Sequence, residues 1–100
     1  MPKLNMTVTH KLSQDEALAR IKSLLGEVKT EFGDKVSNLK EDWSGNRGTF
    51  SFSAMGFRVS GTLTVHESKV DLAGNLPFAA IPIKGKVEAT IRERAEKLLA

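Results

Sequence analysis

The chain has no cysteine and no tyrosine, and only two histidines, among its 100 residues. Without cysteine there can be no disulfide, no thiolate nucleophile and no cysteine-ligated metal. The histidines, His10 and His66, lack the close paired spacing of a histidine metal site. The sequence therefore offers few of the residue types from which enzymes and metal sites are usually built.

Long apolar runs and a strong net charge are also missing. No stretch approaches the roughly 20 apolar residues that span a bilayer, and the polar segment after Met1 is strand-like, unlike a signal peptide. The net charge of +3 falls short of a nucleic-acid footprint. With 40% hydrophobic residues in a chain of this length, we predict a soluble, cytoplasmic protein of one domain.

The last quarter of the chain, residues 75–100, predicts an amphipathic helix that begins near Pro82. Its apolar residues recur at three- and four-residue spacing and so share one face: Ile83, Val87, Ile91, Ala95 and Leu98. The charged residues fall on the opposite side. Such a helix needs an apolar surface to lie on.

A first helix is predicted over residues 14–32. Ser13 and Glu16 form a capping-box pattern, in which Ser13 accepts from the amide of Glu16 and Glu16 reaches back to the amide of Ser13. Gly33 is expected to stop the helix in a left-handed conformation. The apolar stripe is Ala17, Ile21, Leu24, Leu25, Val28 and Phe32.

Five segments alternate between apolar and polar residues and predict strands, namely 4–10, 36–43, 47–54, 57–65 and 69–76. Short turns join the last four into an antiparallel meander, and the first strand is expected to pair with the fifth, in the order 1-5-4-3-2. Gly48, Gly61 and Gly74 fall on inward rows, where a missing side chain indicates a bend or a close approach. We predict an α+β fold of two layers. A curved five-stranded antiparallel sheet carries both helices on one face, in the chain order β-α-β-β-β-β-α.

Few polar residues are candidates for function. His10 ends the first strand on its apolar side, as either a satisfied structural histidine or a functional one, and His66 is expected to be a solvated turn residue. Lys84 and Lys86 flank Gly85 near the start of the second helix, where they oppose the helix dipole. They predict either an anion site or simply solvated lysines.

The apolar candidates are more prominent. Trp43, the only tryptophan, is either part of the core at a sheet edge or a binding platform. Residues 76–83 contain no charge and are either buried or exposed as a binding surface. Leu76, Phe78 and Ile81 of this stretch join Trp43 as the candidate partner or ligand surface, with Phe78 as the anchor.

Short motifs along nearly the whole chain together resemble a known family. They are His10 with Leu12 before the capped helix, Phe32-Gly33, Trp43-Ser-Gly-Asn46, Gly56-x4-Gly61-x-Leu63-x-Val65, Val70-x-Leu72, and Leu76-Pro-Phe78 leading to Lys84-Gly-Lys-Val87. In this order and spacing the chain resembles the polyhydroxyalkanoic acid system proteins, small bacterial proteins named from genes near polyester-storage clusters. It departs from them at Asn46, where an acid is expected, and at residues 79–82, where a leucine-rich form is expected.

The resemblance implies a cytoplasmic bacterial protein connected with polyhydroxyalkanoate granules or their synthesis. It supplies no catalytic residues, because the family has no assigned chemistry, and we expect no cofactor. The order of elements also resembles the TATA-binding-protein-like and helix-grip folds, an analogy of fold that does not carry function. The first hypothesis is therefore a non-catalytic accessory or binding protein that associates with storage granules or with a granule protein.

Other hypotheses are a helix-grip carrier of an apolar ligand and, less favoured, a nucleic-acid-binding protein. A carrier needs a cavity that the predicted core side chains would largely fill. Nucleic acid would use the outward sheet face, which is basic at Lys40, Arg47, Arg58 and Lys69 but lacks an aromatic platform. An enzyme is disfavoured, because no nucleophile, base and orienting group can be assembled. Charges at residues 40–42 on the edge strand favour a monomer over a homodimer.

Overall fold

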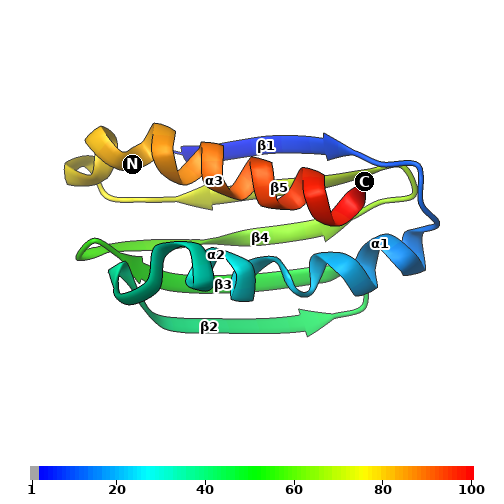
Figure 1. Ribbon diagram of the computed structural model, residues 1–100, viewed down its shortest axis with the longest axis horizontal. Coiled ribbons are helices and arrows are strands. Elements are labelled where there is room, and N and C mark those ends of the chain that lie inside the picture. Colours follow the sequence, from blue (N-terminus) through cyan, green and yellow to red (C-terminus); the bar gives the residue numbers. More distant parts are fainter. Residues whose placement is uncertain (1–2) are drawn as a thin grey trace.

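The computed structural model describes residues 3–100, in which five strands form one antiparallel sheet (Figure 1). The strand order is β1-β5-β4-β3-β2, as predicted. Each predicted strand boundary lies within one residue of the observed one. The strands are β1 (Lys3–Thr9), β2 (Val36–Ser44), β3 (Arg47–Ala54), β4 (Phe57–Val65) and β5 (Lys69–Asn75).

The helices all lie over the same face of this sheet, which confirms the two-layer arrangement. The chain forms α1 (Gln14–Ile21), α2 (Leu24–Phe32) and α3 (Ile81–Leu99), with 3₁₀ turns η1 (Gly33–Lys35) and η2 (Phe78–Ala80). Figure 1 shows α3 running along β1 and β5, beside α1 and α2 over the other half of the sheet. Within residues 3–100 nothing covers the opposite face, which we call the outer face.

The prediction of one uninterrupted helix over residues 14–32 was wrong, because the helix breaks at Lys22 and Ser23. The amide of Ser23 donates to the carbonyl of Arg20 at 3.1 Å, a contact three residues back that tightens the turn. The apolar stripe from Ala17 to Phe32 is buried throughout. In both α1 and α2 this stripe faces the sheet. The helical spacing of the apolar residues therefore continues across the break.

The ends of this helical segment follow the predicted signals in part. Ser13 Oγ accepts from the amide of Glu16 at 3.1 Å, whereas the Glu16 carboxylate accepts from Arg20 Nε at 3.0 Å instead of returning to Ser13. The capping box is thus half formed. Gly33 has the predicted positive φ of 57°, but its ψ of −126° is not that of a left-handed helix. The chain turns from there into η1.

Buried side chains fill the layer between the sheet and the helices. The rings of Phe50 and Phe52 stack with their centroids 6.1 Å apart, in a core to which all five strands and all three α-helices contribute aliphatic residues. On α3 the stripe ends at buried Leu99, and Leu98, which had been predicted, is only half-buried. These side chains occupy the space in which a helix-grip carrier would hold its ligand.

Two of the three inward glycines mark a close approach between strands, as predicted. Gly61 of β4 and Gly74 of β5 stand directly opposite each other. A Cβ on Gly61 would lie 2.5 Å from the carbonyl oxygen of Ala73, and one on Gly74 would lie 2.6 Å from that of Ser60. At Gly48 the approaching group is a side chain instead, because the Trp43 ring lies 2.6 Å from the Cβ position.

Candidate functional site

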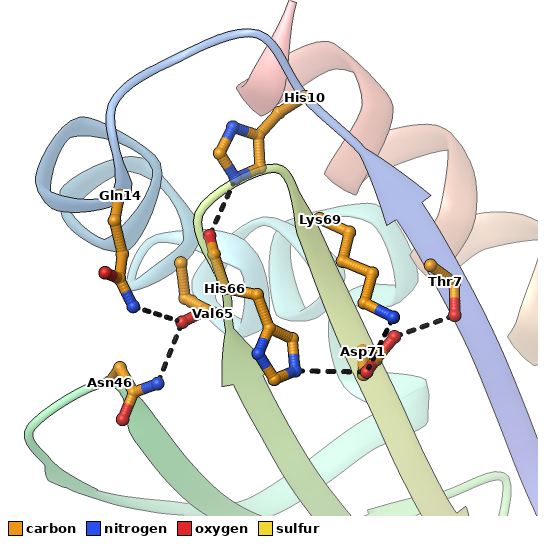
Figure 2. A network of polar contacts seen from close by, with 8 residues as sticks. All are labelled: Thr7, His10, Gln14, Asn46, Val65, His66, Lys69 and Asp71. Atoms are coloured by element: carbon orange, nitrogen blue, oxygen red, sulfur yellow. Dashed lines mark hydrogen bonds and ion pairs between the residues drawn. The ribbon is translucent and has the colours of Figure 1, made fainter.

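His10 is a buried polar residue that follows the end of β1, with 7% of its surface exposed. The amide of Leu12 donates to its Nδ1 at 3.2 Å, so Nε2 carries the proton and donates to the carbonyl of His66 at 3.1 Å (Figure 2). The ring thereby connects the β1–α1 link to the β4–β5 turn. Both ring nitrogens form hydrogen bonds within the fold. Of the two predicted roles for His10, structural or functional, these contacts fit the structural one.

The carbonyl oxygen of Val65 accepts two side-chain amides at the end of β4. Gln14 Nε2 and Asn46 Nδ2 each donate to it at 2.9 Å (Figure 2). The amide of Val65 in turn donates to the Asn46 carbonyl at 2.9 Å. An ionised carboxylate at position 46 could not donate, so the departure from an acid at this position has a structural role here.

A polar cluster that the sequence did not reveal lies on the outer face around Asp71. Thr7 Oγ1 donates to Asp71 Oδ1 at 2.8 Å, His66 Nε2 lies 3.1 Å from Oδ2, and Lys69 Nζ lies 4.0 Å from Oδ2 (Figure 2). His66, expected in a solvated turn, keeps 42% of its side chain exposed but is held by this carboxylate. The pairing of β1 with β5 had been predicted, and in the observed register it places Thr7 directly opposite Asp71. That pairing was therefore the feature of the sequence from which the cluster could have been found.

The cluster holds Asp71 in its ionised form. The hydrogen bond from Thr7 lowers the pKa of this carboxyl below its ordinary value, and the charges of Lys69 and His66 act in the same direction, while partial burial opposes them. The Thr7 hydroxyl bonds to Asp71 and not to the His66 ring, so the contacts do not form a nucleophile–base pair. Across residues 3–100 no three His, Asp or Glu side chains are grouped to hold a metal ion.

Replacing Asp71 with asparagine is expected to reduce the free energy of unfolding at pH 7 by about 0.5–1 kcal/mol, since the contacts are partly solvent-screened. Because folding lowers the pKa of Asp71, its stabilisation is present above the unfolded value near 3.9 and is lost as the pH falls through the folded value. The difference between variant and parent should therefore shrink below about pH 4. Urea unfolding at pH 7 and pH 3 measures this, with Asp34→Asn as the control. An equal difference at both pH values would contradict the account.

The uncharged stretch 76–83 is divided between the core and the surface. Leu76 and Ala80 are fully buried, whereas Phe78 is 68% exposed and Ile81 53% exposed. Leu76 is therefore a core residue and is removed from the candidate partner surface. Together with the exposed residues Ala79 and Pro82, Phe78 and Ile81 form what we call the apolar tip.

The other sequence candidates do not join the apolar tip. Trp43 is half-buried over Gly48, with Lys22 Nζ 5.8 Å from its ring centroid. It ends β2 at the opposite end of the sheet from η2 (Figure 1), so Trp43 and Phe78 cannot form one surface. At the candidate anion site, Lys84 Nζ lies 3.8 Å from the Glu88 carboxylate, which offsets its charge, and Lys86 is exposed.

Comparisons with known proteins give one clear relationship. None of the described helices combines the length and apolarity needed to cross a membrane. A search of curated proteins found no match to the chain. Among solved structures, TTHA0849 from Thermus thermophilus is similar over 98% of this chain and 92% of that one. Its identity is 18% and its TM-score 0.44, too low to support an argument.

The model of the family described as "Putative polyhydroxyalkanoic acid system protein" matches residues 4–99. The resemblance seen in the motifs is thereby confirmed, and the chain belongs to the polyhydroxyalkanoic acid system protein family.

Proposed function

We propose that this protein is a non-catalytic accessory protein of the cytoplasm, and that it associates through the apolar tip with polyhydroxyalkanoate storage granules or with a granule protein. Family membership supports the connection with the polyester system. The observation that carries the proposal is the exposure of Phe78 and Ile81, the large hydrophobic side chains that the described fold leaves open to solvent. Exposed apolar groups that lie together usually mark a binding surface.

The apolar tip is held rigidly by the residues around it. Leu76 and Ala80 are fully buried on either side of Phe78, and the amide of Ala80 donates to the carbonyl of Pro77 at 2.9 Å. Phe78 is thus displayed by an ordered 3₁₀ turn, which lowers the entropy lost on binding. Burying Phe78 and Ile81 would contribute about 3–5 kcal/mol. That range corresponds to an increase in affinity of roughly 10²-fold to several thousandfold.

The edge of the sheet at β2 favours a monomer. The pairing of β2 with β3 shifts between Ser37 and Lys40, and Asn38 adopts a φ of 54°. Such a bulge, followed by Lys40, Glu41 and Asp42, discourages pairing with the edge of another sheet. We therefore propose that the protein binds the granule as a single copy.

Replacing Phe78 with aspartate is expected to weaken sedimentation with native granules at least about tenfold, since a charge cannot enter an apolar interface without a large desolvation cost. Ala89, an exposed residue of α3 away from the apolar tip, provides the matched control. Ala89→Asp adds the same charge and should leave association intact. Circular dichroism of both variants checks that the fold is retained.

The same assay on bare polyester and on protein-coated granules distinguishes the two kinds of partner. Sedimentation with bare polyester would identify the polymer as what the apolar tip contacts. Sedimentation with coated granules alone would identify a granule protein. If neither sediments the protein, or if Phe78→Asp and Ala89→Asp sediment equally well, the proposal is wrong.

A further inference from the structure

The outer face is a second surface that the proposed function does not use. In β1, β3 and β4 inward and outward positions alternate, so the apolar residues point to the helices and the outward rows carry polar side chains. Hydroxyl groups meet across the β3–β4 pair, where Thr49 stands opposite Thr62 and Ser51 opposite Ser60. The centre of the face is therefore a broad area of hydrogen-bonding hydroxyls.

This face also carries the whole net charge of the protein. Of the 15 basic and 12 acidic residues, five basic and two acidic residues lie at outward strand positions, which leaves ten of each sign elsewhere. The two acids are Asp42 and Asp71, and the basic residues are Lys3, Lys40, Arg47, Arg58 and Lys69. The rest of the chain is electrically balanced, and the excess of three positive charges lies at outward strand positions.

Most basic residues of the outer face also lack a carboxylate partner. Lys69 lies 4.0 Å from Asp71, but no carboxylate of residues 3–100 lies within ion-pair distance of Lys3, Lys40, Arg47 or Arg58. Basic residues of the helices are paired more often. Their ion pairs are Arg20–Glu16, Lys84–Glu88, Arg94–Glu31 and Lys97–Glu93. The outer face therefore combines unpaired positive charges with hydroxyl donors, which suits an anion with many oxygen acceptors.

The spread of these charges indicates an extended ligand. Arg47 is paired with Thr64, and Arg58 with Ser53, toward opposite ends of the β3–β4 hairpin. Position 53 is six residue steps along β3 from position 47, which at strand spacing corresponds to roughly 20 Å. A single phosphate cannot contact both arginines, whereas a chain of phosphates can.

We propose that the outer face binds a polymer of phosphates without bases, of which inorganic polyphosphate is the simplest. Single-stranded nucleic acid is held by stacking its bases on aromatic side chains. The outer face offers no such platform, because Phe32, Phe50 and Phe52 are buried, Trp43 and Phe57 pack against the core, and Phe78 lies in the apolar tip. Hydroxyl and guanidinium groups can hold phosphate oxygens without any contact to a base.

The test is the fluorescence anisotropy of labelled polyphosphate titrated with the full chain at low salt. Binding should weaken as salt rises, with a slope of log affinity against log salt of about −3 for four phosphate contacts. The double variant Arg47→Glu/Arg58→Glu should bind at least about tenfold more weakly. Lys11→Glu/Lys35→Glu changes the net charge equally at exposed positions off the outer face and should leave binding nearly unchanged. Phe78→Asp should bind as the parent does, which separates this proposal from the role of the apolar tip.

Three results would overturn the proposal. One is the absence of polyphosphate binding at low salt. A second is an equal loss in both double variants, which would show a response to net charge and not to the outer face. The third is tighter binding of a single-stranded oligonucleotide of matched charge, which would identify nucleic acid as the ligand.

Discussion

Replacing Gly61 with alanine is expected to lower the free energy of unfolding by about 2–4 kcal/mol. The added methyl group would lie 2.5 Å from the carbonyl oxygen of Ala73 and 2.8 Å from Cα of Gly74. Both atoms belong to the backbone of β5, so neither can rotate away as a side chain could. The β4–β5 pair must separate locally, and these central strands connect β1 to the rest of the sheet.

Gly85 provides a control in which the same substitution should have the opposite effect. It lies in α3, where an added Cβ meets nothing within 4 Å. Because alanine has the higher helix propensity, Gly85→Ala should stabilise the protein by about 0.5–1 kcal/mol. Urea unfolding followed by circular dichroism measures both changes. Shifts of the same sign would contradict the close approach of β4 and β5.

The second large effect is expected at His10, where substitution by leucine should cost about 2–3 kcal/mol. Leucine fills much of the same buried space but can neither accept from the amide of Leu12 nor donate to the carbonyl of His66. Two partly buried backbone groups would then lose their partners. Leaving such groups unpaired costs more than the hydrogen bonds themselves contribute.

His66→Leu is the control for His10→Leu. It removes a half-exposed histidine, so it separates the cost of losing the buried His10 contacts from the cost of losing any histidine. His66 is half-exposed, and its contact with Asp71 is open to water, so its loss should cost about 0–1 kcal/mol. Denaturant midpoints of the two variants give the comparison. A His10→Leu protein as stable as the parent would show that the two ring contacts do not support the fold, and would reopen a functional role for this side chain.

The strands and their order could be predicted from the sequence because all of them except β2 alternate cleanly, and short turns leave few ways to pair the last four. The break between α1 and α2 at Lys22 and Ser23 could not be predicted. Neither residue is proline or glycine, and the apolar stripe from Ala17 to Phe32 keeps its helical period. At Glu16 two partners compete for one carboxylate. Arg20, one turn later, takes it from the Ser13 amide, and spacing alone does not decide such a competition.

The candidate surfaces were predictable only in part for a similar reason. The alternation of the predicted fifth strand places Leu76 on the inward row with Val70 and Leu72, and Leu76 is buried. Residues 77–82 continue neither a strand period nor a helix period, so their sequence could not show that Phe78 points outward. The Asp71 cluster joins residues from β1, β5 and the turn after β4, and its prediction needs the register between distant strands. The outward basic residues were visible in the sequence. The cancellation of charge over the rest of the chain became visible only when the outward strand positions were assigned.

The pairing of the first strand with the last sets the order in which the protein can be completed. The meander from β2 to β5 joins neighbours in the chain, whereas β1 reaches across to β5, from Lys3 opposite Asn75 to Thr9 opposite Lys69. Closing so long a loop is slow compared with forming hairpins. On a ribosome adding about 5–20 residues per second, β1 has no partner strand for several seconds. Through that interval the apolar row of Leu4, Met6 and Val8, buried in the finished sheet, is open to chaperones and to other nascent chains.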